Sequence, residues 1–238
     1  MTVAAHLTEL RRRLVWSALV FIAAAVICFL FIDSFVELAL GLSNDFSFVY
    51  LSPAELVTCY LKLALVMGLV FASPFILWQV WAFVSPGLTK KEGRAALFSI
   101  VAGFGFFLIG TLFCFVVVLP ITLQFFYSFN GATDIAPSIS FNNYMNFILG
   151  MLVAFGAVFE MPVLSYLLAR LGLIQAAWLA KGRKFAILVV FTVAAIITPP
   201  DVVSQIMTAI PMLGLYELSI LVARAAAKGR KEQSENEE

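Results

Sequence analysis

The chain has 238 residues, of which 63% are hydrophobic and only 12% charged, with a mean hydropathy of +1.03. Soluble domains carry about twice that share of charged residues, so the composition excludes a water-soluble fold and indicates a membrane protein. The formal charge of +1 excludes bulk attraction to nucleic acid, and one histidine with three widely separated cysteines offers no metal site, disulfide framework or histidine-based catalytic triad.

Apolar runs long enough to cross a bilayer predict six membrane-spanning helices. In chain order, they cover approximately residues 14–32, 63–83, 96–119, 141–169, 185–199 and 202–221. The first run follows Arg11-Arg12-Arg13, an arrangement that also occurs in secretory signal peptides. The run is too long for a signal peptide, and no small-residue cleavage site follows it. We therefore expect a retained first helix.

The segment between the first two spans predicts a packed external cap, because residues 33–52 are rich in aromatic and aliphatic side chains. Ser52-Pro53-Ala54-Glu55 has the pattern of a capping box with proline in the first helical turn. The second helix should therefore begin outside the membrane at Pro53. Pro74 lies inside the second apolar run and predicts a kink there.

The later spans are marked by prolines. Residues 95–133 contain no charge, but as one helix they would be about 58 Å long, too long for one crossing, so the third span should end near Pro120. The fourth contains Glu160 and Pro162. The fifth and sixth are short and flank Pro199-Pro200-Asp201, which predicts a tight hairpin, and Thr198-Pro199-Pro200-Asp201 repeats the capping pattern before the sixth helix.

The basic residues give an independent test of this topology. Six crossings place 14 of the 15 lysines and arginines on the side of the two termini, and only Lys62 on the other. Under the positive-inside rule, the N and C termini are then cytoplasmic. We expect an all-α membrane protein with one six-helix domain over residues 1–227 and a disordered cytoplasmic tail over residues 228–238.

Glu160 is the sharpest candidate for function, because about 15 Å of helix separates it from Arg170 at the cytoplasmic end. A charged acid near the bilayer centre costs about 2.5–3.5 kcal/mol, so it should be protonated, paired or hydrated. Pro162 frees the Val158 carbonyl nearby and predicts a kink in this helix. We favour a polar group that lines a cavity or a proton-linked site over the alternative, a neutral acid hydrogen-bonded inside the bundle.

Three further polar residues have simple structural explanations. Glu9 lies four positions before Arg13, so a local ion pair is expected, and the surroundings of Glu92 favour a solvated loop charge. Both nevertheless present cytoplasmic carboxylates that can each bind a guanidinium through two hydrogen bonds. Gln205 follows Asp201 by four positions and fits an interhelical hydrogen bond as well as a functional role. Phosphate-binding glycine loops and hydrolase motifs are absent, so the sequence does not indicate an enzyme.

Five motifs occur in order along nearly the whole chain. They are His6-Leu7-x-Glu9-Leu10-Arg11, Ser52-Pro53, Ser73-Pro74-Phe75-Ile76-Leu77-Trp78-Gln79-Val80-Trp81-Ala82-Phe83, Phe155-Gly156-x-x-Phe159-Glu160-x-Pro162-Val163 and Thr198-Pro199-Pro200-Asp201-Val202-x-Ser204-Gln205. Together they resemble the TatC family, the multispanning core and signal-receptor subunit of the twin-arginine protein translocase. The chain departs slightly at Gly93, where the family usually has a larger residue.

The resemblance implies a concave bundle in the bacterial inner membrane that binds folded precursor proteins carrying twin-arginine signal peptides. It also implies export with TatA and TatB partners in an oligomeric complex surrounded by lipid, driven by the proton motive force, without a cofactor. Glu9 and Glu92 match acids that receive the signal's arginines. Residues in the same recognition region are Arg11, Phe83 and Arg94. Glu160 matches a glutamate in the concave pocket, and Gln205 a position for partner docking.

Two other classes of protein stay open from the residues alone. A proton-coupled secondary transporter of a small solute would use Glu160 as the proton carrier and Pro74, Pro120 and Pro162 as helix breaks. However, no internal repeat is visible, and Gln205 is the one evident polar companion near the midplane. A purely structural assembly subunit would fit the short fifth and sixth helices and the apolar cap equally well.

Overall fold

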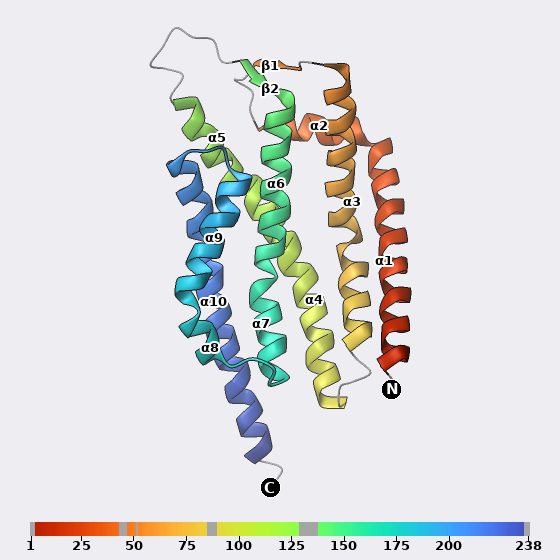
Figure 1. Cartoon of the computed structure of the whole chain (residues 1–238), viewed down its shortest axis with the longest axis vertical. Helices are drawn as coiled ribbons and strands as arrows, with labels where there is room; N and C mark the ends of the chain where they lie inside the picture. Colours follow the sequence, from red (N-terminus) through yellow and green to blue (C-terminus); the bar gives the residue numbers. More distant parts are fainter. Residues whose placement is uncertain (1–2, 43–46, 51, 85–89, 129–137, 236–238) are drawn as a thin grey trace.

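The computed structural model describes residues 3–42, 47–50, 52–84, 90–128 and 138–235, apart from the side chains of residues 3–6, 81, 84, 90–96 and 229–235. Long helices run side by side along the molecule (Figure 1). A short helix and a small sheet lie across one end of this bundle, and both termini lie at the opposite end (Figure 1). Termini at one end fit an even number of crossings.

The elements follow one another in a single helical chain with two short strands. They are α1 (Val3–Leu30), α2 (Ile32–Leu40), β1 (Ser47–Val49), α3 (Pro53–Val84), α4 (Lys90–Phe113), the π-helical turn η2 (Cys114–Val118), α5 (Leu119–Ser128), β2 (Ser138–Ser140), α6 (Phe141–Phe159), α7 (Met161–Arg170), α8 (Ala176–Lys181), α9 (Arg183–Ile197) and α10 (Val202–Glu235).

Five helical segments in the described ranges are long and apolar enough to cross a membrane. They are Leu7–Leu30, Pro53–Val80, Leu97–Ser128, Phe141–Arg170 and Val202–Lys228. The remaining predicted span is α9, which has 15 residues and is therefore about 22 Å long, against a hydrocarbon core of about 30 Å. The fold is thus that of a multi-pass helical membrane protein. The sixth crossing and the side on which the termini lie stay predictions.

Two expected boundaries differ from those in the structure. The third helix does not end near Pro120, because α4, η2 and α5 continue to Ser128. The wide π turn lies directly before Pro120, where it accommodates the missing N–H and the bulk of the proline ring. The sequence predicts disorder from residue 228, but residues 228–235 continue α10, since the segment carries good helix formers and extends an existing helix.

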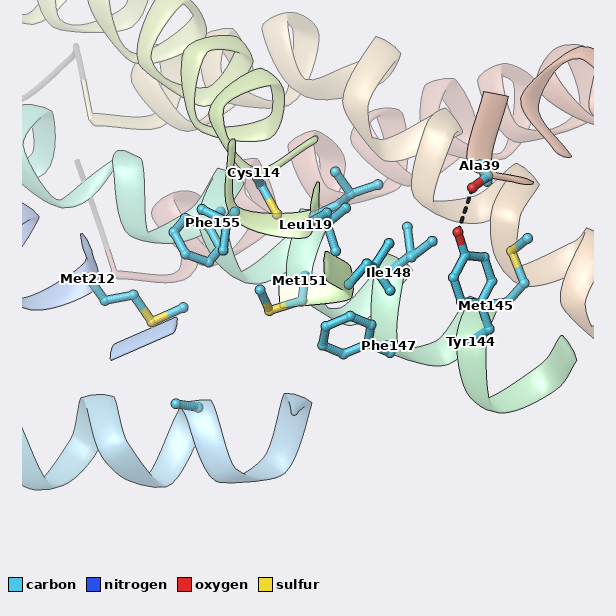
Figure 2. Close-up of a cluster of buried hydrophobic side chains, with 14 of the residues drawn as sticks. Ala39, Cys114, Leu119, Tyr144, Met145, Phe147, Ile148, Met151, Phe155 and Met212 are labelled. Carbon is cyan, nitrogen blue, oxygen red and sulfur yellow. Dashed lines mark hydrogen bonds between the residues drawn. The ribbon is translucent and has the colours of Figure 1, made fainter. Parts of the chain in front are cut away.

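The core is built around α6, the central helix of the bundle (Figures 1 and 2). Met145, Ile148, Met151 and Phe155 are fully buried and recur every three or four residues, so they share one face of α6. Figure 2 shows this face against residues of the α4–α5 segment and of α10. Because lipid is as apolar as these side chains, their close packing stabilises the bundle more than their removal from water does.

The expected packed cap is present at the end of the bundle away from the termini, with a feature that the sequence did not predict. Strands β1 and β2 pair in parallel, from Ser47 opposite Ser138 to Val49 opposite Ser140. The Tyr144 hydroxyl donates to the Ala39 carbonyl at 2.7 Å and ties α6 to α2 (Figure 2). The ring centroids of Phe48 and Tyr144 lie 4.7 Å apart, so β1, α2 and α6 form one packed unit.

Helices α1 and α3 approach each other closely at a glycine. A β-carbon at Gly68 would lie 2.7 Å from the Cα and the backbone nitrogen of Ala25. Small residues at such contacts allow helix backbones in a membrane to pack tightly. This contact sets the distance between the two helices that form the first candidate site.

Candidate functional site

A cavity of about 420 Å³ lies between α1 and α3, towards the end of the bundle that carries the termini. Its lining combines charged, amide and aromatic side chains: Glu9, Arg12, Arg13 and Trp16 from α1, and Phe75, Trp78 and Gln79 from α3. The aromatic rings form its apolar walls. The cavity can therefore hold a ligand that is both cationic and partly apolar.

Glu9 and Arg13 form the expected ion pair inside this cavity. The Arg13 Nη2 donates to Glu9 Oε1 at 2.5 Å, and Arg13 Nε donates to the same oxygen at 3.1 Å. Arg13 Nη1 also donates to Gln79 Oε1 at 3.2 Å, which links α1 to α3. The Glu9 and Arg13 side chains are 22% and 24% exposed, so an arriving ligand can reach them. A pair this accessible contributes only about 0.2–1 kcal/mol, and another guanidinium can compete for it.

The other residues expected in the recognition region lie at the same end of the chain's first three long helices. Arg11 is exposed on α1 and does not line the cavity, while Phe83 is half-buried in the last turn of α3. Glu92 and Arg94 lie in the first turns of α4, but their side chains fall outside the described part of the chain. Their approach to Glu9 therefore stays a prediction.

Glu160 lies at the break between α6 and α7, which Pro162 produces as expected. The Glu160 N–H donates to the Ala157 carbonyl at 3.2 Å, a tighter turn than in an α-helix, and the Leu164 N–H donates to the Glu160 carbonyl at 2.9 Å. The Glu160 side chain is only 9% exposed. Its Oε1 has no hydrogen-bond partner among the residues that the structure describes.

Gly103 on α4 makes room for this buried carboxyl group. A β-carbon at position 103 would lie 2.9 Å from Glu160 Oε2, closer than side-chain atoms normally pack. A buried acceptor without a partner costs about 1–3 kcal/mol, so the group is available to water or a ligand. The unpartnered Oε1 does not fit an acid that is fully hydrogen-bonded within the bundle, and the pocket-lining role of Glu160 stays a prediction.

Asp201 and Gln205 both organise the α9–α10 hairpin. The Asp201 Oδ1 accepts from the Ser204 N–H at 2.7 Å, and its Oδ2 accepts from the Ser204 hydroxyl, so Asp201, and not the Thr198 of the predicted capping pattern, caps α10. Gln205 Nε2 donates to the Phe191 carbonyl of α9 at 2.9 Å. This bond agrees with the structural interpretation of Gln205, an interhelical hydrogen bond. Of the other structural prolines, Pro53 begins α3 as predicted, and α3 continues through Pro74.

Sequence reasoning missed two contacts that the fold makes at these sites. Arg13 and Gln79 are 66 positions apart, and Gly103 and Glu160 are 57 apart, so no local pattern connects them. Gln79 was detectable, because it is an amide within an otherwise apolar run. Within the described residues, no group of three or more His, Cys, Asp and Glu is placed to hold a metal ion.

Comparison with known proteins gives one consistent family. The family model described as Sec-independent protein translocase protein (TatC) matches residues 5–211. The chain is 42% identical over 231 residues to the TatC of Helicobacter pylori strain 26695, covering 97% of this chain and 90% of that protein. It is 37% identical to the TatC of Aquifex aeolicus, covering 98% of both. A crystal structure of the twin arginine translocase receptor TatC aligns with a TM-score of 0.84 and 37% identity, covering 93% of this chain and 99% of that one.

Proposed function

We propose, from the premise that this chain belongs to the TatC family of Sec-independent protein translocase proteins, that it is the receptor for twin-arginine signal peptides. The protein is thus a multi-pass inner-membrane component of a protein-transport system. One observation carries the receptor assignment: Glu9 already holds a guanidinium, that of Arg13, inside a cavity with aromatic walls. The alternative of a small-solute transporter is not favoured.

The Arg13 guanidinium stands where an arginine of the signal would bind. A carboxylate accepts the planar guanidinium through short, charge-assisted hydrogen bonds, which an ammonium cannot match in geometry. An incoming arginine competes with Arg13 for Glu9, and Gln79 holds the displaced Arg13 through its amide oxygen. Lysine should therefore replace arginine poorly in the signal.

A second carboxylate, Glu92, would receive the second arginine of the motif. It lies in the first turn of α4, directly after the segment that connects α3 to α4. Phe83, Arg11 and Arg94 complete the recognition region in this proposal, with Phe83 supplying apolar contact. The signal's apolar stretch then follows the concave bundle towards Glu160, whose unpartnered oxygen keeps one polar position in an otherwise apolar wall.

The wider assembly follows from the same proposal. TatA-type and TatB-type single-span subunits would join this protein in an oligomeric complex that exports folded precursors using the proton motive force. Gln205 contributes indirectly to partner docking, because its hydrogen bond fixes the conformation of the α9–α10 hairpin that a partner would contact. The recognition region is placed in the cytoplasm, together with both termini, because 14 of the 15 basic residues gather on that side in the six-crossing topology.

A binding experiment with a matched control tests the receptor assignment. Glu217 also pairs with an arginine, through bonds of 2.7 and 2.8 Å to Arg183, but it does not line the cavity of Glu9. With the purified full chain, Glu9→Gln should weaken the binding of a twin-arginine signal peptide about two- to fivefold, while Glu217→Gln should not. The wild type should retain a twin-lysine peptide poorly. Equal retention of both peptides would refute the assignment.

A further inference from the structure

A second cavity, of about 470 Å³, lies between α7, α8, α9 and α10 and has no part in the proposed signal site. Its lining is aliphatic and aromatic, with Met161, Trp178, Val189, Val193 and Met212 among its residues. The Tyr216 hydroxyl also lines it, but this group already donates to the Leu179 carbonyl at 2.7 Å. The walls therefore offer mainly apolar contact, with the Trp178 indole N–H as a polar group among the residues named.

Three basic residues lie close in the chain to one edge of this cavity. Gly182 belongs to the lining, and Lys181, Arg183 and Lys184, all three exposed, lie within two positions of it but do not line the cavity themselves. Arg183 is neutralised by its two bonds to Glu217. Neither Lys181 nor Lys184 has an acidic partner among the residues that the structure describes. Of these two lysines, Lys181 directly precedes the lining residue Gly182, whereas helical spacing puts Lys184 on the face of α9 opposite Phe185, Ala186 and Val189.

The same region has the character of a membrane interface. Trp178, on the cavity wall, is 59% exposed, and Phe185, also on the wall, is 71% exposed. Tryptophan next to basic residues is typical of the level of the lipid headgroups, where the ring contacts acyl chains and the charges contact phosphate. Because α9 is only about 22 Å long, a bilayer that it spans must be thinner beside it.

We propose that this cavity binds an acyl chain of an anionic phospholipid, whose phosphate is bound by Lys181. The apolar walls contact the chain, and the Lys181 ammonium group complements the charge of the phosphate. The volume argues against a spanning partner helix, since a single turn 10 Å wide and 5.4 Å long already fills roughly 420 Å³. A flexible acyl chain can instead enter from the side and follow the cavity into the bilayer.

Lipid retention by the purified full chain tests this proposal. The protein is exchanged into detergent containing either palmitoyl-oleoyl phosphatidylglycerol or palmitoyl-oleoyl phosphatidylcholine, and bound lipid is counted by native mass spectrometry. The wild type should retain the phosphatidylglycerol preferentially. A lysine near an anionic headgroup contributes about a fivefold preference, so Lys181→Gln should lower phosphatidylglycerol retention by roughly fivefold. Lys62→Gln, which removes a base far from the cavity, should leave retention unchanged.

A second variant separates the acyl chain from the headgroup. Ala186 lines the cavity, so Ala186→Phe should fill it and lower the retention of both lipids. The thermal unfolding midpoint of every variant is measured beside its lipid count, which identifies a variant that merely unfolds. Unchanged phosphatidylglycerol retention in either folded variant, or equal retention of the two lipids by the wild type, overturns the proposal. Crosslinking of a single-span partner from position 185, with no lipid retained, would assign the cavity to a protein contact instead.

Discussion

The backbone of Gly103 packs directly against the carboxyl group of Glu160, so that a β-carbon on α4 would lie 2.9 Å from Glu160 Oε2. The other carboxyl oxygen, Oε1, would lie 3.5 Å from the same β-carbon, and it is the one buried side-chain N or O atom of the described residues without a hydrogen-bond partner. The space that Glu160 occupies is thus defined by a glycine 57 positions earlier. Any change at Gly103 acts first on the carboxyl group, because it is the end of a flexible side chain.

Gly103→Ala should displace the Glu160 carboxyl group without unfolding the protein. The added methyl group is disfavoured by about 1–3 kcal/mol, but the carboxyl can move aside, and alanine gains about 1 kcal/mol of helix propensity over glycine. We expect a similar unfolding midpoint and reduced export of a twin-arginine precursor in a transport assay. Gly105→Ala, where no atom lies within 4 Å of the added carbon, is the control and should export normally. Normal export by Gly103→Ala would show that the carboxyl position does not matter.

Gly68→Ala should lower stability more clearly, because its neighbours cannot move aside. The added carbon would meet the Cα and nitrogen of Ala25, which belong to the backbone of α1. Overpacking of this kind costs about 1–3 kcal/mol, or about 2–4 °C of unfolding midpoint for each kcal/mol in a chain of this size. Thermal unfolding in detergent measures the change. Gly214→Ala on α10, which has open space around it, should change the midpoint little in comparison.

Gln79 should contribute to signal binding through Arg13. Gln79→Leu removes the acceptor at 3.2 Å from Arg13 Nη1, so Arg13 no longer has an alternative partner when a signal arginine takes Glu9. We expect a roughly threefold to tenfold rise in the Kd of a twin-arginine peptide, as for the loss of one partly exposed hydrogen bond to a charged group. Gln79→Glu restores an acceptor and should restore or improve binding. If both variants bind the twin-arginine peptide weakly, Gln79 contributes through the shape of its side chain and not through the hydrogen bond to Arg13.

Gln205→Leu should loosen the α9–α10 hairpin by a modest amount. Hydrogen bonds between membrane helices contribute on average about 0.6 kcal/mol and at most about 1.7 kcal/mol. The loss of the bond to the Phe191 carbonyl should therefore lower the unfolding midpoint by a few degrees. Signal-peptide binding should stay normal, because the cavity of Glu9 lies between other helices. A strong loss of peptide binding would contradict this division of roles.

Asp201→Ala should cost about 0.5–2 kcal/mol, because it removes the cap of α10. Both carboxylate oxygens of Asp201 accept from Ser204, so the first turn of the helix loses two hydrogen bonds at once. Asp201→Asn keeps one oxygen that can accept from the Ser204 N–H and should recover most of the stability. Equal unfolding midpoints for the two variants would show that Asp201 does not stabilise the protein through the cap of α10.

The fold was predictable from the sequence where the signal is local. Glu160 with Pro162 predicted the break that separates α6 from α7, and the pattern before Pro53 predicted the start of α3. The predictions failed where a proline or a polar composition was interpreted without its neighbours. Pro120 did not end its helix, because the π turn before it accommodates the proline ring. Residues 228–235 continued α10, because they extend a helix that is already formed. The strands β1 and β2 were missed, since three residues each carry no periodic pattern.

By itself, the sequence determined the membrane class, most of the long helices, the family resemblance and the candidate acids Glu9 and Glu160. Those properties depend on composition, on periodicity and on motifs of neighbouring residues. Only the tertiary structure decided which groups face one another: Arg13 with Gln79, Gly103 with Glu160, and Gln205 with the Phe191 carbonyl. The reason is physical, because in a bundle packed within lipid the partner of a side chain is set by helix packing and not by distance along the chain.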